Sequence, residues 1–443
     1  MSGTSALDRG QRAALRLITK AGALPVLKNP EVREKVERAL RRGTGGAAKA
    51  QLAVGRAFVW ARGSGSPART QPRPSGSLFD LTPTDDQAML RAAARELADE
   101  VIRPAGKQAD SECAVPAEVR AAAVEMGLGL IGVPAELGGI AEENPAVATC
   151  LVLEELARGD MGIAAGLMAT GAVATAIARY GTSDQQATFL PHLTNEEPAA
   201  AALAIQEPQP LFDPFALRTS ANLVDGLLHL NGTKALVPQA TSAELFLVAA
   251  MVDEVPLLLI VAAGTDGVTV ESDPAMGMRA AATGRVTFTD VQVEEDHVLG
   301  TAEDYRDVVR RARLAWAACA VGSAQAVLDQ VIPYVKDRTA FTEPIGHRQG
   351  VAFIVSDIAI ELESLRLTVW RAAALLDSAG TVRGADATEL IAKARQLASR
   401  HAAWIGSNGV QLLGGHGFVT EWDNERWFRD LRGAGMLEGC LLV

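Results

Sequence analysis

Three short segments carry residue types that packing alone does not explain. Arg338-Thr339-Ala340-Phe341 lies at a break between two long helical patterns, and Gln349 follows eleven residues after the arginine. The segment Gln411–Phe418 ends another helical pattern with three glycines, which leave backbone N–H groups open to a ligand. Leu437-Glu438-Gly439-Cys440 places a carboxylate near position 440. Taken singly, each segment can also be explained without a function, as an arginine at a helix end, a glycine cap or an exposed glutamate.

The first region that would position these segments, residues 78–200, has helical periodicity. Thr84-Asp85-Asp86-Gln87 is a capping box, and an apolar face follows it at Leu90, Ala94, Leu97 and Val101. Pro104 is predicted to end this helix. Ser183-Asp184-Gln185-Gln186 is predicted to be a second capping box, which opens a helix near residue 184.

Residues 201–300 have the pattern of strands. Asn231-Gly232 separates two short apolar runs, 228–230 and 233–237, and is predicted to be the turn of a β-hairpin. Another strand is expected across Val286–Val293, with a break near Asp290. About a hundred residues is a typical size for one domain, so this region is predicted to be a β domain.

Residues 301–443 return to helical periodicity. Three long helices are predicted at Glu303–Arg338, His347–Ser378 and Ala385–Leu413. Helices of about 30 residues are about 45 Å long and pack best as an antiparallel bundle.

Composition and charge limit the kinds of function. The chain is 443 residues long, 48% apolar and without clustered cysteines, which indicates a globular protein without a disulfide framework. The uncharged stretch 161–178 is rich in Ala, Gly and Thr, so a buried helix is expected there rather than a membrane span. Residues 76–443 carry a net charge of −22, which argues against nucleic acid as a partner.

The basic N-terminal extension, residues 1–77, contrasts with the acidic remainder. Its first 75 residues hold 15 Lys and Arg against 4 Asp and Glu, and it closes with the flexible linker Gly63–Ser77. Val32, Val36 and Leu40 recur every four residues between basic side chains. The extension could contact an anionic membrane surface or an acidic partner, serve as a transit peptide, or pack on the protein's own body.

The sequence argues against two kinds of site, a glycine-rich dinucleotide-binding loop and a histidine metal site. Gly127-x-Gly129-x-x-Gly132 matches a dinucleotide-binding pattern, but a helical segment precedes it and an extended segment follows, so Gly127 is predicted to cap a helix instead. The six histidines have no metal-ligand spacing, and no metal site is expected.

Several segments, in order along the chain, resemble those of the acyl-CoA dehydrogenase family. They cover about residues 80–440 and comprise Met126–Gly139, Gln206-Glu207-Pro208, Leu230–Lys234, Val286–Val293, Arg338–Phe341, Gln411–Gly417 and Arg429–Gly439. The resemblance implies a mainly α fold with an N-terminal helical domain (78–200), a middle β-barrel-like domain (201–300) and a C-terminal four-helix bundle (301–443). It also implies a dimer of dimers.

The resemblance implies FAD-dependent α,β-desaturation of an acyl-CoA thioester. A carboxylate removes the α-proton while the thioester oxygen is stabilised, and FAD accepts the β-hydride. Glu438 matches the catalytic base, and Ala312 occupies the position from which some relatives supply it. Arg313 matches an arginine near that site, and the backbone of Glu438 and Gly439 would lie beside the thioester.

The flavin contacts implied by the resemblance are only partly retained. The matching positions, some of which would serve a neighbouring subunit, are Arg338, Phe341, Gln349, Gln411, Gly414 and Gly415, and the amide of Gln206 could also reach the flavin. Leu236-Val237-Pro238 replaces a Trp-Ile-Thr segment, and Pro210-Leu211-Phe212 replaces small, flexible residues. Proline has no N–H to donate.

Three hypotheses follow from this combination of retained and replaced family residues. The first is a working FAD-dependent acyl-CoA dehydrogenase, favoured because Glu438 and Arg338 are retained. The second is a non-catalytic or half-site partner subunit that completes a homologue's flavin site. The third, less favoured, is a flavin oxidase or monooxygenase of the same fold.

The expected partners and location follow from the family. They are an acyl-CoA substrate from fatty acid metabolism and lipid degradation, an electron-transfer flavoprotein as acceptor, and further copies of this chain or a homologue. The expected location is the bacterial cytoplasm, with membrane association through the basic extension as one option. A mitochondrial matrix location would follow if the N-terminus is a transit peptide.

Overall fold

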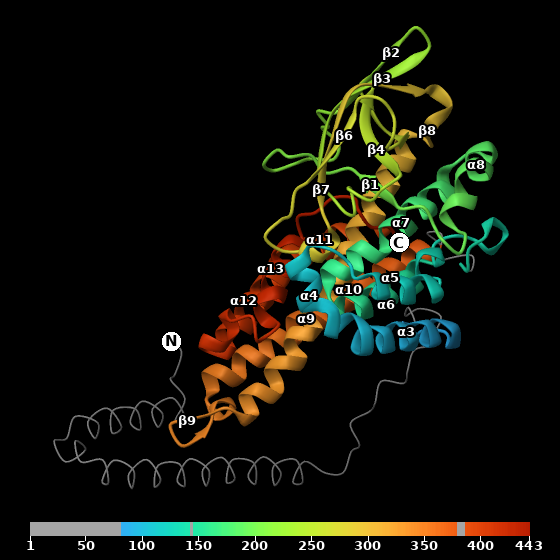
Figure 1. The fold of residues 1–443 in the computed structure, drawn as a ribbon. Helices are drawn as coiled ribbons and strands as arrows, with labels where there is room; N and C mark the ends of the chain where they lie inside the picture. Colours follow the sequence, from blue (N-terminus) through green and yellow to red (C-terminus); the bar gives the residue numbers. More distant parts are fainter. Residues whose placement is uncertain (1–80, 142–144, 379–385) are drawn as a thin grey trace, which may run out of the picture. The chain divides into compact units, whose positions relative to one another are not determined.

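The computed structural model describes residues 81–141, 145–378 and 386–443, so the predictions for the basic N-terminal extension lie outside the described residues. The first helical region contains α3 (Asp85–Leu97), α4 (Arg103–Glu112), α5 (Ala117–Glu125), α6 (Ala146–Gly159), α7 (Met161–Tyr180) and α8 (Ser183–Leu193). Figure 1 shows α4 and α6 beside the long helices of the C-terminal region, and α8 farther from them, near the strands.

The first helix begins as predicted but does not end at Pro104. The side chains and backbones of Thr84 and Gln87 form the reciprocal capping box. A π-helical turn, Ala98–Ile102, then joins α3 directly to α4, so that Pro104 lies in the first turn of α4 and does not end the helical run. The second capping box also forms, but one residue earlier than predicted, between Thr182 and Gln185.

A mostly antiparallel sheet follows the first helical region. Its strands pair in the order β6-β7-β3-β2-β4-β5-β8, and β1 adds a parallel pairing with β4. The bounds are β1 (Ala201–Ala204), β2 (Ser220–Val224), β3 (Leu227–Val237), β4 (Leu245–Val252), β5 (Val255–Ala262), β6 (Val268–Ser272), β7 (Gly284–Glu294) and β8 (Val298–Leu299). Figure 1 shows the strands gathered at one end of the described helices.

The predicted hairpin turn at Asn231-Gly232 is wrong. Both residues lie inside β3, and the turn from β2 to β3 is at Asp225-Gly226, where both backbones are left-handed with φ of 52° and 85°. The pairing of β3 with β7 shifts register between Leu230 and Gly232, which marks a β-bulge. The Asn-Gly pair therefore produces a bulge, because β3 continues beyond it to pair with β7.

The expected break near Asp290 is part of the same irregularity. Asp290 has a φ of 53°, and its N–H donates to Oδ1 of Asn231 at 2.9 Å. The two strands therefore bend together at this point.

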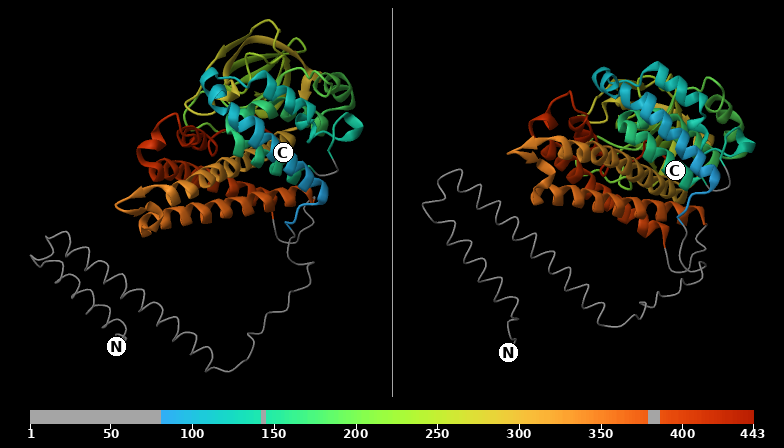
Figure 2. Two further views of the ribbon diagram at one scale, coloured as in Figure 1. Left: turned by 60° about the horizontal axis from the view of Figure 1, so that its bottom comes forward. Right: turned by 90° about the horizontal axis from the view of Figure 1, so that it is seen from below.

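The C-terminal helical region has the three predicted long segments. They are α9 (Ala302–Asp337), α10 (Gln349–Asp377) and the pair α11 (Ala387–Leu397) and α12 (Ala403–Leu413), which a π-helical turn joins, and α13 (Asn424–Gly433) follows. Figure 2 shows α9 and α10 running side by side, in agreement with their many close contacts. The buried side chains of Trp316 and Trp427 lie in the apolar core of this region.

The helix α7 connects the sheet to the helical bundle. One apolar cluster contains Val173 of α7, Leu203 of β1, Leu247 of β4 and Val308 of α9. Within the described residues, α7 and α9 are long and apolar enough to cross a membrane, but 89% and 78% of their apolar windows are buried. The prediction of a buried helix at residues 161–178, which belong to α7, is therefore confirmed.

Candidate active site

The buried carboxylate of Glu438 lies where the C-terminal segment meets the sheet and α9. Its side chain is 5% exposed and accepts hydrogen bonds from Arg313, whose Nη2 lies 2.8 Å from Oε1 and whose Nε lies 3.0 Å from Oε2. The N–H of Glu438 donates to Oε1 of Gln206 at 3.1 Å. The structure thus brings together three residues that are distant in sequence, Gln206, Arg313 and Glu438.

The backbone after Glu438 is held against both neighbouring domains. Trp316 of α9 donates from Nε1 to the carbonyl of Gly439 at 2.9 Å. Gly439 has a left-handed φ of 74°, and an added Cβ would lie 2.8 Å from Cβ of Ile205, so only glycine fits. Cys440 Sγ lies 3.5 Å from the carbonyl oxygen of Leu236. The segment after the carboxylate therefore packs directly on the strand that was predicted to contact flavin.

The loop after Gln206 is anchored by a buried ion pair. Lys234 Nζ donates to Glu207 Oε1 at 2.9 Å, and both side chains are at most 1% exposed. Burial lowers the pKa of Lys234 to about 8, although the Glu207 charge opposes that change. Glu207 also accepts from the N–H groups of Arg218 and Thr219, which closes the base of the loop.

An aromatic pair from this loop and α9 covers Arg313. The rings of Phe215 and Tyr305 are 6.1 Å apart in an edge-to-face arrangement, and the Arg313 guanidinium lies 5.9 Å from the Phe215 ring. Tyr305 donates its hydroxyl proton to the carbonyl of Pro214 at 2.6 Å. Burial, followed by the charge of Glu438, raises the pKa of Tyr305 well above its usual range, so this hydroxyl remains a donor.

A small apolar cavity of about 220 Å³ lies beside the chain segment that contains Glu438. Leu437 and Cys440, which flank the glutamate and Gly439, both line it. Leu236 and Pro238, the residues that replace the family's aromatic and hydroxyl positions, line the same cavity, as does Trp316. The cavity therefore lies between the predicted flavin-binding strand and the segment that carries the predicted base.

The other predicted flavin-binding residues lie at the opposite end of α9. Their side chains or backbones are exposed, and they are Arg338, Phe341, Gln349, Gln411, Gly414 and Gly415. Tyr334 ties the glycine turn to α9, because its hydroxyl donates to the carbonyl of Leu413 at 3.0 Å and lies 3.0 Å from Nδ1 of His416.

These two groups of predicted site residues do not meet within one chain. Arg313 and Arg338 are 25 residues apart along one helix, which corresponds to ~37 Å at the rise of an α-helix. The structure therefore places the predicted residues in two groups: a base group at Glu438, with Gln206, Arg313 and Gly439, and a glycine-turn group at Arg338 and Gly414. Their roles in binding stay predictions.

Both groups offer polar atoms that suit FAD. Gly414 and Gly415 have open space where a Cβ would be, and no described residue pairs with the Arg338 guanidinium, so the turn could receive a phosphate-bearing cofactor. The amide nitrogen of Gln206 has no acceptor among the described residues and could donate to the flavin ring. Leu236 and Pro238 provide apolar side chains in place of an aromatic ring and a hydroxyl, which is the poorest part of the fit.

Sequence reasoning missed Arg395 of α11. Its Nη2 lies 3.0 Å from Oε1 of Glu438 and its Nη1 donates to the carbonyl of Leu437 at 2.6 Å. The available signal was an arginine beside the apolar face formed by Ile391, Ala394 and Ala398, where a long charged side chain needs a buried partner.

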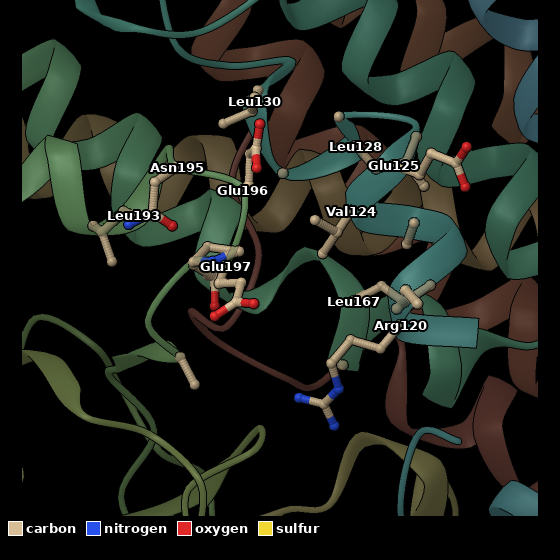
Figure 3. Close-up of a pocket in the computed structure, with 18 of the residues that line it drawn as sticks. Arg120, Val124, Glu125, Leu128, Leu130, Leu167, Leu193, Asn195, Glu196 and Glu197 are labelled. Carbon is tan, nitrogen blue, oxygen red and sulfur yellow. The ribbon is translucent and has the colours of Figure 1, made fainter. Parts of the chain in front are cut away.

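A larger cavity of about 590 Å³ contains none of the predicted site residues. It lies between α5, α7 and the segment 195–200, and Figure 3 shows Arg120 and Glu197 at its wall. Nη1 of Arg120 donates to Oε1 of Gln239, and Nε2 of Gln239 donates to the carbonyl of Gly166, each at 2.6 Å. These bonds join the cavity wall to the strand that ends at Val237.

Three family models match this chain in succession. They are the N-terminal domain of acyl-CoA dehydrogenase at residues 84–197, its middle domain at 202–291 and its C-terminal domain at 306–441. The predicted mainly α fold with a middle sheet is confirmed.

Named relatives and solved structures agree with the family models. The chain is 31% identical to the mitochondrial short/branched chain specific acyl-CoA dehydrogenase of Rattus norvegicus, over 80% of this chain and 83% of that protein. It is 30% identical to the short-chain specific enzyme of Homo sapiens, over 79% and 86%. Butyryl-CoA dehydrogenase from Megasphaera elsdenii superimposes with a TM-score of 0.73 at 27% identity, over 82% of this chain and 96% of that one.

The comparisons also bear on activity and cofactor. A glutaryl-coenzyme A dehydrogenase in complex with glutaryl-CoA superimposes with a TM-score of 0.74 at 26% identity, over 81% of this chain and 93% of that one. The predicted activity class, oxidation of a CH–CH bond, and the predicted FAD dependence are confirmed at the level of the family. By its sequence, its three matched domains and its fold, this chain belongs to the acyl-CoA dehydrogenase family.

Proposed function

We propose that this protein is an FAD-dependent acyl-CoA dehydrogenase that introduces an α,β double bond into a short or branched acyl-CoA. The observation that carries the proposal is the buried Glu438 carboxylate, whose backbone N–H donates to Gln206 and whose neighbours Leu437 and Cys440 line the small cavity that Leu236 also lines. A carboxylate shielded from water in this way can act as a base toward a carbon acid.

In this proposal each group near Glu438 has one task. Glu438 removes the α-proton of the thioester, and bound FAD supplies the acceptor for the β-hydride. The Gly439 N–H, which has no acceptor among the described residues, donates to the thioester oxygen. Arg338, Gln411 and the Gly414-Gly415 turn hold the cofactor of a neighbouring subunit, since they are far from Glu438 in their own chain.

The proposed acyl group is small. The relatives with which the chain shares about 30% identity are named for short or branched chains, and the cavity beside Glu438 is only about 220 Å³. Butyryl-, isobutyryl- and 2-methylbutyryl-CoA are therefore expected to react faster than octanoyl- or palmitoyl-CoA.

The test is the visible spectrum of the purified chain before and after anaerobic addition of these acyl-CoA thioesters. Flavin in the protein is expected to bleach with the short or branched substrates. Glu438→Gln keeps the size of the side chain but removes the base, and we expect at least a ~100-fold slower bleaching from loss of general-base catalysis. Equal bleaching rates in the two proteins would exclude Glu438 as the base.

A half-site partner subunit is the second candidate, because Leu236 and Pro238 offer the flavin ring little polar contact. A colourless chain that takes up no added FAD alone, but restores flavin binding to a co-expressed homologue, would favour it. An oxidase or monooxygenase would instead show rapid reaction of the reduced flavin with oxygen.

The proposed assembly and partners follow the family. We propose a dimer of dimers, or a heteromer with a homologue, in the cytoplasm of a bacterium, with an electron-transfer flavoprotein as acceptor. Light scattering of the purified chain tests the assembly, and electron transfer to added flavoprotein tests the acceptor. Deleting residues 1–77 and measuring binding to anionic vesicles tests membrane contact through the basic extension.

A further inference from the structure

Two arginines from different helices bind the same carboxylate. Arg313 projects from α9 and Arg395 from α11, and both guanidinium groups contact Glu438. The Glu438 side chain is 5% exposed, and those of Arg313 and Arg395 are 27% and 15% exposed. The three side chains therefore form an ion cluster that is largely excluded from water, which makes their mutual geometry more rigid than that of a surface ion pair.

The two oxygens of the carboxylate are occupied unequally. Oε1 accepts from Arg313 Nη2 at 2.8 Å, from Arg313 Nε at 3.1 Å and from Arg395 Nη2 at 3.0 Å. Among the described residues, Oε2 accepts only from Arg313 Nε, at 3.0 Å. The single N–H of Arg313 Nε is shared and lies slightly nearer Oε2, where it fills one of about two lone-pair positions. Arg313 Nη2 and Arg395 Nη2 together fill both positions of Oε1, so Oε2 retains one for another proton.

The fork of Arg395 binds both the side chain and the backbone of this segment. While Nη2 contacts Oε1, Nη1 donates to the carbonyl of Leu437, the preceding residue. A planar guanidinium can make these two contacts at once, which a lysine ammonium cannot reproduce in the same geometry. Burial lowers the pKa of Arg395, the Glu438 charge raises it and Arg313 lowers it, so its partner carboxylate offsets part of the cost of burial.

We propose that Arg395 is a positioning residue that saturates Oε1 of Glu438 and thereby makes Oε2 the oxygen that takes the substrate's α-proton. The inference rests on the proposed function. In the step itself the Cα–H bond breaks and an Oε2–H bond forms, and the electron pair of the broken bond stays on the substrate. Arg395 exchanges no proton. It fixes the rotation of the carboxylate and the backbone at Leu437.

The central variant is Arg395→Met, which retains an unbranched apolar side chain but removes both donors. A misdirected base is expected to reduce kcat by about a hundredfold, with KM changed less than threefold. With an α,α-dideuterated short-chain acyl-CoA, the isotope effect on flavin bleaching is expected to increase, because proton removal becomes more strongly rate-limiting. Loss of folded protein would lower the active fraction but leave the isotope effect unchanged.

Arg395→Lys and Lys393→Met are the matched variants. The lysine at position 395 can reach Oε1 or the Leu437 carbonyl but not both, so its rate is expected between those of wild type and Arg395→Met. Lys393 lies on the same helix, and its ion pair with Glu389 is exposed on both sides, so Lys393→Met is expected to behave as wild type.

A measurement that needs no turnover tests the contact itself. In a double-mutant cycle of Arg395→Met and Glu438→Gln, monitored by urea unfolding, the two effects are expected to be non-additive. Additive effects would overturn the contact and with it the inference.

The outcomes separate this inference from the proposed function. If wild type does not bleach with any acyl-CoA, the proposed function fails. If wild type bleaches and Arg395→Met has the same rate and isotope effect, the positioning role is wrong while the function stands. If Arg395→Met does not fold, Arg395→Lys decides: an unchanged rate and isotope effect in that variant would overturn the inference.

Discussion

Glu438 and Asp430 are both buried carboxylates of the C-terminal segment, but their surroundings differ. Glu438 has two arginine partners. Asp430 accepts from the N–H of Met278 at 2.5 Å, and burial, followed by the charge of Asp160, raises its pKa. The surroundings of Asp430 therefore favour a neutral acid that ties α13 to the loop before β7.

We predict that Asp430 makes the stability of this protein depend on pH. Burial, then the charge of Asp160, raises the pKa of Asp430 to about 7, against about 3.9 in an unfolded chain. The folded state therefore holds this proton more tightly, so the associated stability is fully present below about pH 4 and is lost as the pH rises through about 7. Urea unfolding midpoints are therefore expected to fall as the pH rises from about 4 to about 7.

Asp430→Asn is the variant that isolates this effect. The asparagine can still accept from Met278 N–H but cannot ionise, so the decline with pH is expected to flatten. Asp273→Asn, which removes an aspartate that is 39% exposed and pairs with Arg285, should retain the wild-type decline. An identical decline in Asp430→Asn would assign the pH dependence to other groups.

At the scale of elements, α6 and α9 approach each other at Gly322. An added Cβ at this position would lie 1.9 Å from the carbonyl oxygen of Glu154, which belongs to the backbone of α6. The same stretch of α6 carries the buried Glu154, which accepts from Arg366 Nε at 2.8 Å and from Trp370 Nε1 at 3.0 Å. The close approach therefore aligns α6, α9 and α10 together.

Gly322→Ala is predicted to destabilise the fold strongly. The helices would have to separate, and overpacking of this kind costs about 1–3 kcal/mol or more in the free energy of unfolding. Gly350→Ala is the matched control, since Gly350 is also helical and a Cβ there meets nothing within 4 Å. It is expected to stabilise by about 0.5–1 kcal/mol. Similar urea midpoints for both variants would show that the helices are not in close contact.

The elements also show where local sequence patterns mislead. Thr84 and Gln87 cap α3 as predicted, because a capping box uses only neighbouring residues. Asn231-Gly232 has the composition of a hairpin turn but lies inside β3, where pairing with β7 on both sides of the bulge is the stronger constraint. Pro104 does not end the helical run as its residue type predicts, because it follows directly on a π-helical turn that joins α3 to α4.

At the scale of the whole molecule, the predicted site residues of one chain form two separate groups. The base group at Glu438 and the glycine-turn group at Arg338 and Gly414 are at opposite ends of α9. A complete flavin site in the proposed assembly would combine the base group of one subunit with the glycine-turn group of its neighbour.

This arrangement predicts complementation between two inactive variants. Glu438→Gln lacks the base, and Arg338→Glu places a negative charge at the glycine turn that would repel a phosphate-bearing cofactor. When the two are denatured, mixed and refolded together, mixed assemblies contain some sites with both intact halves, so part of the acyl-CoA dehydrogenase activity is expected to return. No recovery in mixtures shown to exchange subunits would mean that each site is built from one chain.

Sequence by itself determined the order of helical and β regions, the long helices, the first capping box and the identity of the family. These features depend on periodicity, on residues a few positions apart, or on motifs that occur in a fixed order. The tertiary structure alone decided which of the proposed site residues meet. Arg395 reaches Glu438 from 43 positions away, and Arg338 does not reach it at all within the chain, because helix packing brings α11 to the base and the length of α9 keeps the glycine turn apart.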